Sequence, residues 1–241
     1  MEKKHTLSKK LPIVSMLLAC IVAMAATTVV SYLFSGNAEI AENLASSVAA
    51  LVVLLVFWWW FLPEFKGDFR LRIPLAEMWP LIIPYIGFCV LAAVFSWVDV
   101  GPYFNPTAMA VAMGISAGFV EETWFRGLAV PIGMGYLPRD KRIFLTVVIT
   151  SVFFGVLHLG NVFNGAELVV GIVQAVATTF AGIFFIAVFL RSGSILVPIF
   201  MHGFYDWVCF VTDPTLVGGV ITTECVSLGL VLALALHIVL G

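Results

Sequence analysis

The stretch Thr107–Ile132, TAMAVAMGISAGFVEETWFRGLAVPI, is an apolar segment of membrane-spanning length that contains three charged residues, Glu121, Glu122 and Arg126. A helix needs about 20 apolar residues to cross a hydrocarbon core, and it satisfies its own backbone hydrogen bonds in lipid. Ionisable side chains within a span are costly, so each needs a partner or a water-filled cavity. The stretch therefore predicts a transmembrane helix with a functional site inside it.

The composition of the whole chain agrees with a lipid environment. Of the 241 residues, 62% are hydrophobic and only 11% are charged, and the mean hydropathy is +1.11. These values lie far from those of soluble domains and predict an integral membrane protein in a lipid bilayer. The net charge of −2 provides no basic field, so we expect no nucleic-acid partner.

Seven further stretches have a similar length and apolar character. Together they predict an all-α, polytopic transmembrane helix bundle of about eight spans. We find no internal repeat and no linker long enough to separate a second domain, so residues 1–241 are expected to form a single membrane domain. The predicted spans are Leu11–Phe34, Leu44–Leu62, Trp79–Val98, Thr107–Ile132, Ile143–Leu157 and a little beyond, Leu168–Leu190, Ile195–Val211 and Leu216–Leu240.

The basic residues predict how the bundle is oriented. Every Lys and Arg except Arg126 lies before the first span or in a loop on the same side of the membrane, whereas the opposite loops contain acids and no base. Positively charged loops stay in the cytoplasm, so both termini are expected there. A Lys-rich start followed by Ala23-Met24-Ala25 also fits a cleavable signal peptide. The apolar run continues to Phe34, which favours a retained first span.

The charged residues of the fourth span differ in their expected partners. Glu122 and Arg126 are four residues apart and share a helix face, so we expect an ion pair between them. Glu121 is rotated from Glu122 by about 100° and has no base at this spacing. We expect Glu121 to be the better general base. A purely structural role for the acidic pair would need only one carboxylate.

Two other predicted spans contain histidines. His158 lies on the fifth span, four residues after Phe154, and His202 and Asp206 lie four residues apart on the seventh. Histidine exchanges protons near neutral pH, although a lone intramembrane histidine is often only a hydrogen-bond partner between helices. At 1.5 Å per residue, His158 is about 22 Å from the cytoplasmic end of its span and His202 about 10 Å. A shared site therefore requires tilted helices.

The ordered motifs Glu-Glu-x-x-x-Arg, Phe-x-x-x-His and His-x-x-x-Asp, each on its own span, resemble those of the CAAX protease and bacteriocin-processing (Abi) family of intramembrane proteases. The resemblance covers about residues 107–211. It implies a multi-pass endopeptidase of a bacterial plasma membrane that cleaves a membrane-associated peptide or protein. Peptide pheromone maturation, bacteriocin self-immunity and membrane-protein processing all remain open as its biological task.

The resemblance also implies roles for the motif residues. Glu121 and His158 would activate a water molecule that attacks the scissile carbonyl. His202 and Asp206 would stabilise the oxyanion, and Glu122 and Arg126 would give structural support.

Asp206 departs from the commoner family pattern, in which asparagine is frequent at this position. An ionised aspartate donates no hydrogen bond and repels an oxyanion. We therefore expect Asp206 to orient His202 rather than to contact the oxyanion directly.

The family is also described as a metalloprotease family, which raises the question of a bound metal. Glu121, His158 and His202 offer a ligand set for Zn²⁺ with one position left for water. The chain has no His-Glu-x-x-His motif, and an Asp paired with His202 also resembles a carboxylate that orients a histidine without binding a metal itself. We favour a glutamate mechanism without a cofactor, and Zn²⁺ stays open as the alternative.

Two other classes of function compete with proteolysis. The chain could be a non-catalytic bacteriocin self-immunity protein or membrane interaction protein, for which loss of Glu121 would leave binding intact. It could also be a proton-coupled carrier, because buried Glu and His build proton relays. The carrier is disfavoured, since the chain lacks repeated halves with broken spans in matching positions.

Overall fold

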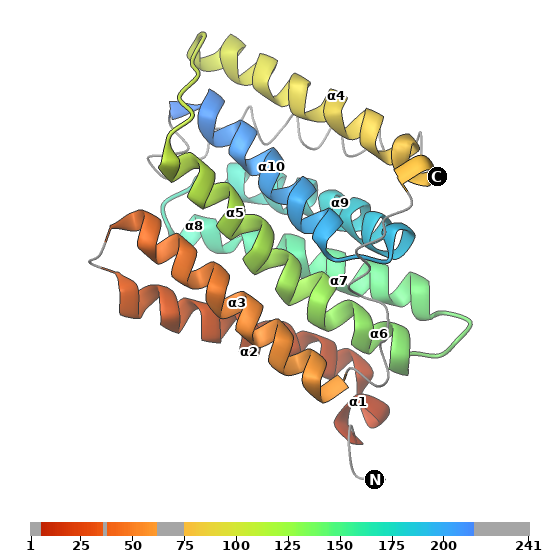
Figure 1. Cartoon of the computed structure of the whole chain (residues 1–241). Helices are drawn as coiled ribbons and strands as arrows, with labels where there is room; N and C mark the ends of the chain where they lie inside the picture. The colour runs from red at the N-terminus through yellow and green to blue at the C-terminus, as the bar shows by residue number, and fades with distance from the viewer. Residues whose placement is uncertain (1–5, 36–37, 62–74, 215–241) are drawn as a thin grey trace.

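The computed structural model describes residues 6–35, 38–61 and 75–214, and its regular structure in this part of the chain is helical (Figure 1). Within these described ranges, five helices are long and apolar enough to cross a membrane. The prediction of an all-α, multi-pass membrane protein is therefore confirmed. The last predicted span, Leu216–Leu240, and the basic loop containing Lys66, Arg70 and Arg72 lie outside the described residues.

The long helices agree with the predicted spans to within a few residues at most ends. They are α2 (Pro12–Phe34), α3 (Glu39–Phe61), α4 (Leu75–Val100), α7 (Arg142–His158) and α9 (Leu168–Ser192). A shorter apolar helix, α10 (Leu196–Thr212), matches the seventh predicted span. Two short helices, α1 (Thr6–Lys10) and α8 (Gly160–Phe163), were not predicted.

The fourth predicted span is continuous but is not a regular α-helix. It consists of α5 (Ala108–Glu122), the π-helix η1 (Thr123–Ala129) and α6 (Val130–Tyr136). The Val130 N–H donates to the Phe125 carbonyl, five residues back, immediately before Pro131, which has no N–H to donate. Because π-helical turns are rare and often occur at functional sites, this irregularity directly after the acidic pair is notable.

The α5 helix occupies the middle of the bundle (Figure 1). It contacts α3 on one side and α10 on the other. The α2–α3 pair forms one edge of the bundle, whereas α4 lies at the opposite edge against α10 and α9. The central position of α5 places the acidic pair at its end next to both α10 and η1.

Glycines allow α5 and α10 to approach closely. Gly114 and Gly118 form a Gly-x-x-x-Gly pattern on α5 and face Gly203 of α10. A Cβ at Gly114 would lie 2.6 Å from the Gly203 carbonyl oxygen, and one at Gly118 would lie 2.8 Å from the Gly203 nitrogen. Small residues at this spacing are typical of close helix contacts in membranes. The contact brings His202, next to Gly203, close to the acidic pair.

A second close contact joins α7 and α9. Gly155 of α7 faces Thr179 and the Ala175 carbonyl of α9, and Gly182 of α9 faces Ser151 of α7. A Cβ at Gly182 would lie 3.1 Å from Ser151 atoms. The tight packing of the two helices fixes Phe154 and His158 relative to α9.

The glycine contact between α5 and α10 can be tested by adding a single methyl group. We expect Gly118→Ala to lower the free energy of unfolding by about 1–3 kcal/mol, because its Cβ meets the backbone of α10 and cannot be accommodated by a side-chain shift. Gly87→Ala in α4 is the matched control, since its Cβ meets nothing within 4 Å. Thermal unfolding in detergent micelles measures both variants, and equal unfolding temperatures would contradict the assigned contact.

Candidate active site

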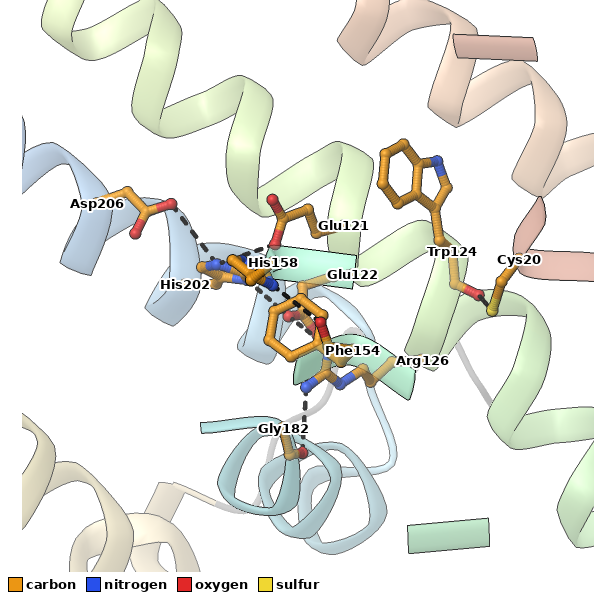
Figure 2. A network of polar contacts seen from close by, with 10 residues as sticks. All are labelled: Cys20, Glu121, Glu122, Trp124, Arg126, Phe154, His158, Gly182, His202 and Asp206. Carbon is orange, nitrogen blue, oxygen red and sulfur yellow. Dashed lines mark hydrogen bonds and ion pairs between the residues drawn. The ribbon is translucent and has the colours of Figure 1, made fainter. Parts of the chain in front are cut away.

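The first polar contact of the site is the ion pair between Glu122 and Arg126, as predicted from their spacing (Figure 2). The Arg126 Nη1 atom lies 3.1 Å from Glu122 Oε1, and the two side chains are 1% and 0% exposed. Arg126 Nη2 also donates to the Gly182 carbonyl oxygen over 3.1 Å. Because removal of either charge would leave the other buried without its ion-pair partner, the two residues depend on each other.

Aromatic rings surround the guanidinium group of Arg126. Its Cζ atom lies 5.7 Å from the ring centroid of Phe125, 4.9 Å from that of Phe154 and 5.4 Å from that of Phe185. A cation at this distance from a ring face is attracted by the ring's quadrupole. These rings come from η1, α7 and α9, so the buried charge links three helices.

His202 lies at the centre of the carboxylates (Figure 2). Its Nδ1 atom lies 2.7 Å from Glu122 Oε1, whereas its Nε2 atom lies 3.5 Å from Asp206 Oδ2 and 3.7 Å from Glu121 Oε2. Since Glu122 Oε1 is the carboxylate oxygen of the ion pair with Arg126, it accepts in this short bond and the Nδ1–H of His202 donates. Both ring nitrogens therefore face carboxylate oxygens.

The two adjacent glutamates have different environments. Glu122 is fully buried, and its Oε1 atom meets both Arg126 and His202. The Glu121 side chain is 26% exposed, whereas that of Glu122 is 0% exposed. The Oε2 atom of each glutamate is buried and has no hydrogen-bond partner within the part of the chain that the structure describes. Of the two carboxylates, only that of Glu121 therefore belongs to a side chain that is partly accessible from outside the core.

His158 joins the same group through an aromatic ring. Its Nδ1 atom donates to the Phe154 carbonyl oxygen over 2.8 Å, because a carbonyl can only accept. In the neutral ring, this bond leaves the lone pair on Nε2. The Phe154 ring meets His158 edge-on at 4.8 Å and His202 edge-on at 6.1 Å. The two histidines, which differ in predicted depth, thus flank one phenylalanine.

The π-helix that follows the acidic pair has an additional support from α2. The Cys20 thiol donates to the Trp124 carbonyl oxygen over 3.1 Å, within η1 (Figure 2). Cys20 is buried and packs in the same apolar cluster as Phe125 and Phe154. The thiol thereby satisfies a carbonyl of the irregular segment that carries Arg126.

The arrangement does not fit the zinc site considered from sequence. Among the residues that the structure describes, no three His, Cys, Asp or Glu side chains are grouped closely enough to hold a metal ion. His158 uses Nδ1 for a backbone bond, and both nitrogens of His202 already face carboxylates. We therefore assign no step to a metal.

Some contacts of the site were not predicted from sequence. The bond between Glu122 and His202 joins residues 80 positions apart, and Phe185 and Gly182 of α9 lie outside all three motifs. Spacing within a helix revealed the Glu122–Arg126 pair, but it contains no information on partners from other helices. Only the Gly114-x-x-x-Gly118 pattern could have predicted that α5 has a close neighbour.

Residues 103–208 match a protein family described as type II CAAX prenyl endopeptidase, Rce1-like. No curated protein and no solved structure matches the chain. The matched segment contains all three motifs and every residue around His202 described above. The match supports a protease, which is a hydrolase. It confirms the resemblance to the CAAX protease family that the three motifs indicate.

The buried ion pair can be tested by a double-mutant cycle. We expect Arg126→Met to lower the free energy of unfolding by about 3–5 kcal/mol, because Glu122 then remains as a buried charge without its base. The double variant with Glu122→Gln should be more stable than Arg126→Met alone. Unfolding in detergent micelles gives the free energies, and strictly additive losses would show that the two residues are not coupled.

Proposed function

We propose that the protein is an intramembrane endopeptidase in which Glu121 activates water to cleave a peptide bond of a membrane-associated peptide or protein. The observation that carries this proposal is the contrast between the adjacent glutamates. Glu122 is fully buried and bound by both Arg126 and His202, whereas the Glu121 side chain is 26% exposed and has only His202 near its carboxylate, at 3.7 Å. A general base needs a carboxylate that a water molecule can reach.

In the first step, Glu121 takes a proton from a water molecule as the water oxygen attacks the carbonyl carbon of the substrate. His158 supports this step, since its Nε2 lone pair can accept a hydrogen bond from the second O–H of the water, which keeps that proton, while Nδ1 stays bound to Phe154. The water is then oriented by two acceptors. Its attack gives a tetrahedral intermediate with a negatively charged oxygen.

His202 is suited to stabilise that oxygen. With Glu122 at Nδ1 and two carboxylates near Nε2, the surroundings favour an imidazolium ring that has protons on both nitrogens. Its Nε2–H can donate to the oxyanion. Glu122 is the nearer orienting group at 2.7 Å, and Asp206, 3.5 Å from Nε2, helps to keep that nitrogen protonated.

In the last step, protonated Glu121 gives its proton to the nitrogen of the leaving amine, and the C–N bond breaks. The products are a carboxylic acid and an amine, and Glu121 returns to its ionised form. The water thereby supplies both the hydroxyl group of the acid and the proton of the amine. Neither a metal nor a cofactor is needed for this balance.

We further propose that the chain crosses the bacterial plasma membrane about eight times with both termini in the cytoplasm. The distribution of basic residues supports this topology. The substrate would be a peptide or protein tail presented from the membrane.

The role of Glu121 predicts a loss of cleavage in Glu121→Gln, which keeps the shape of the side chain but cannot accept the water proton. We expect the rate to fall by at least a factor of about 10²–10⁴. The substrate probe is a panel of internally quenched peptides with varied C-terminal tails, with and without a farnesyl thioether, added to proteoliposomes.

Glu167→Gln is the matched control, because Glu167 is an exposed carboxylate at the start of α9. It should cleave as the wild type does. Equal turnover by Glu121→Gln and the wild type would refute the proposed mechanism. A non-catalytic immunity protein would show no cleavage by any variant.

The mechanism without a metal makes a separate prediction. We expect purified wild-type protein to contain no stoichiometric zinc and to keep its activity after dialysis against a chelator, because Glu121 and His158 activate the water directly. Elemental analysis and the peptide assay measure the two quantities on the same sample. Zinc that is lost together with activity, and restores activity when added back, would overturn this prediction.

A further inference from the structure

A phenylalanine outside the three motifs stacks on the central histidine. Phe185 of α9 is 5% exposed, and its ring lies parallel to that of His202, with a centroid distance of 4.8 Å and an interplanar angle of 15°. The ring of its neighbour Phe184 stacks on the ring of Tyr85 in α4, with a centroid distance of 6.1 Å. The two adjacent rings also meet each other edge-on at 5.6 Å, but the ring that stacks on His202 is that of Phe185.

The orientation of the His202 ring plane determines which groups its two nitrogens can hydrogen-bond. Hydrogen bonds of an imidazole lie in the ring plane, so a rotation of the ring moves both Nδ1 and Nε2 away from their partners. The bond to Glu122 fixes only one edge of the ring. The flat face of Phe185 limits rotation about that bond, and Phe154 stands edge-on to the same ring at 87°.

Phe185 is itself held firmly. It packs in an apolar cluster with Tyr85 and Met201, and the guanidinium group of Arg126 lies 5.4 Å from its ring centroid. Gly182, one turn earlier on α9, accepts a hydrogen bond from Arg126 and packs against Ser151. The position of the ring therefore depends on the same arginine that holds Glu122.

We propose that Phe185 is a positioning residue that holds the plane of the His202 imidazole, so that Nδ1 faces Glu122 and Nε2 faces the reacting group. This inference rests on the proposed function of His202, but Phe185 acts through the histidine and does not contact the substrate. An aromatic ring at this place also attracts the imidazolium form of His202 by a cation–π interaction. An aliphatic side chain would give neither effect.

The test compares variants that keep or remove the ring in the full-length protein. Phe185→Met and Phe185→Leu remove the aromatic face but leave an apolar side chain, whereas Phe185→Tyr keeps the face. Phe184→Met is the matched control, because it removes a neighbouring ring of α9 that stacks on Tyr85 instead of His202. Thermal unfolding in micelles first identifies the variants that are folded.

Two readouts follow. The first is the ¹⁵N spectrum of histidine-labelled protein, in which the His202 signals are assigned by their loss in His202→Gln; the chain contains only four histidines. The second is the kinetics on the quenched peptide that the wild type cleaves fastest.

We expect the ring-free variants to broaden or shift the His202 Nδ1–H signal and to lower kcat about ten- to a hundredfold with little change in KM. Phe185→Tyr and Phe184→Met should stay near the wild type.

Wild-type His202 signals and kcat in a folded ring-free variant would overturn the inference. An equal loss in Phe184→Met would also overturn it, because the effect would then belong to the packing of α9 in general. The spectrum needs no substrate, so it tests the orientation of His202 even if no peptide is cleaved. Absence of cleavage by the wild type would count against the proposed function, whereas an unchanged spectrum counts against the role of Phe185.

Discussion

The bond between Glu122 and His202 is the interaction on which the rest of the site depends. It joins α5 to α10 in a buried environment and is only 2.7 Å long. The acceptor, Glu122, also forms an ion pair with Arg126, and Arg126 is in turn held by the Gly182 carbonyl and three phenylalanine rings. In lipid, a charge without such partners would be costly. The site is therefore a chain of mutually dependent groups rather than a set of independent side chains.

This dependence explains why neighbouring residues of the same type serve different purposes. Glu122 neutralises Arg126 and fixes His202, and it has no surface left for a substrate. The Glu121 side chain is partly exposed and lies 3.7 Å from His202 Nε2. Because Glu122 already balances the buried arginine, the charge of Glu121 is not needed for that purpose and is available for the proposed chemistry.

The surrounding helices hold this arrangement by contacts that carry no charge. The glycines of α5 and α10 permit the close approach that a Glu122–His202 bond requires. The tight contact between α7 and α9 places the rings of Phe154 and Phe185 against the ring of His202. The π-helix η1 then directs Arg126 back toward Glu122. Packing of small residues thus replaces the hydrophobic effect, which does not drive association between helices in lipid.

The sequence by itself determined the helical class, most of the span positions and the Glu122–Arg126 pair, because hydropathy and helical spacing are local properties of the chain. It also supplied the ordered motifs that indicate the CAAX protease family. Only the tertiary structure decided that His202 bonds to Glu122 more closely than to Asp206, and that Phe185 stacks on its ring. The physical reason is that these partners come from different helices, whose rotation and tilt depend on packing between segments far apart in the chain.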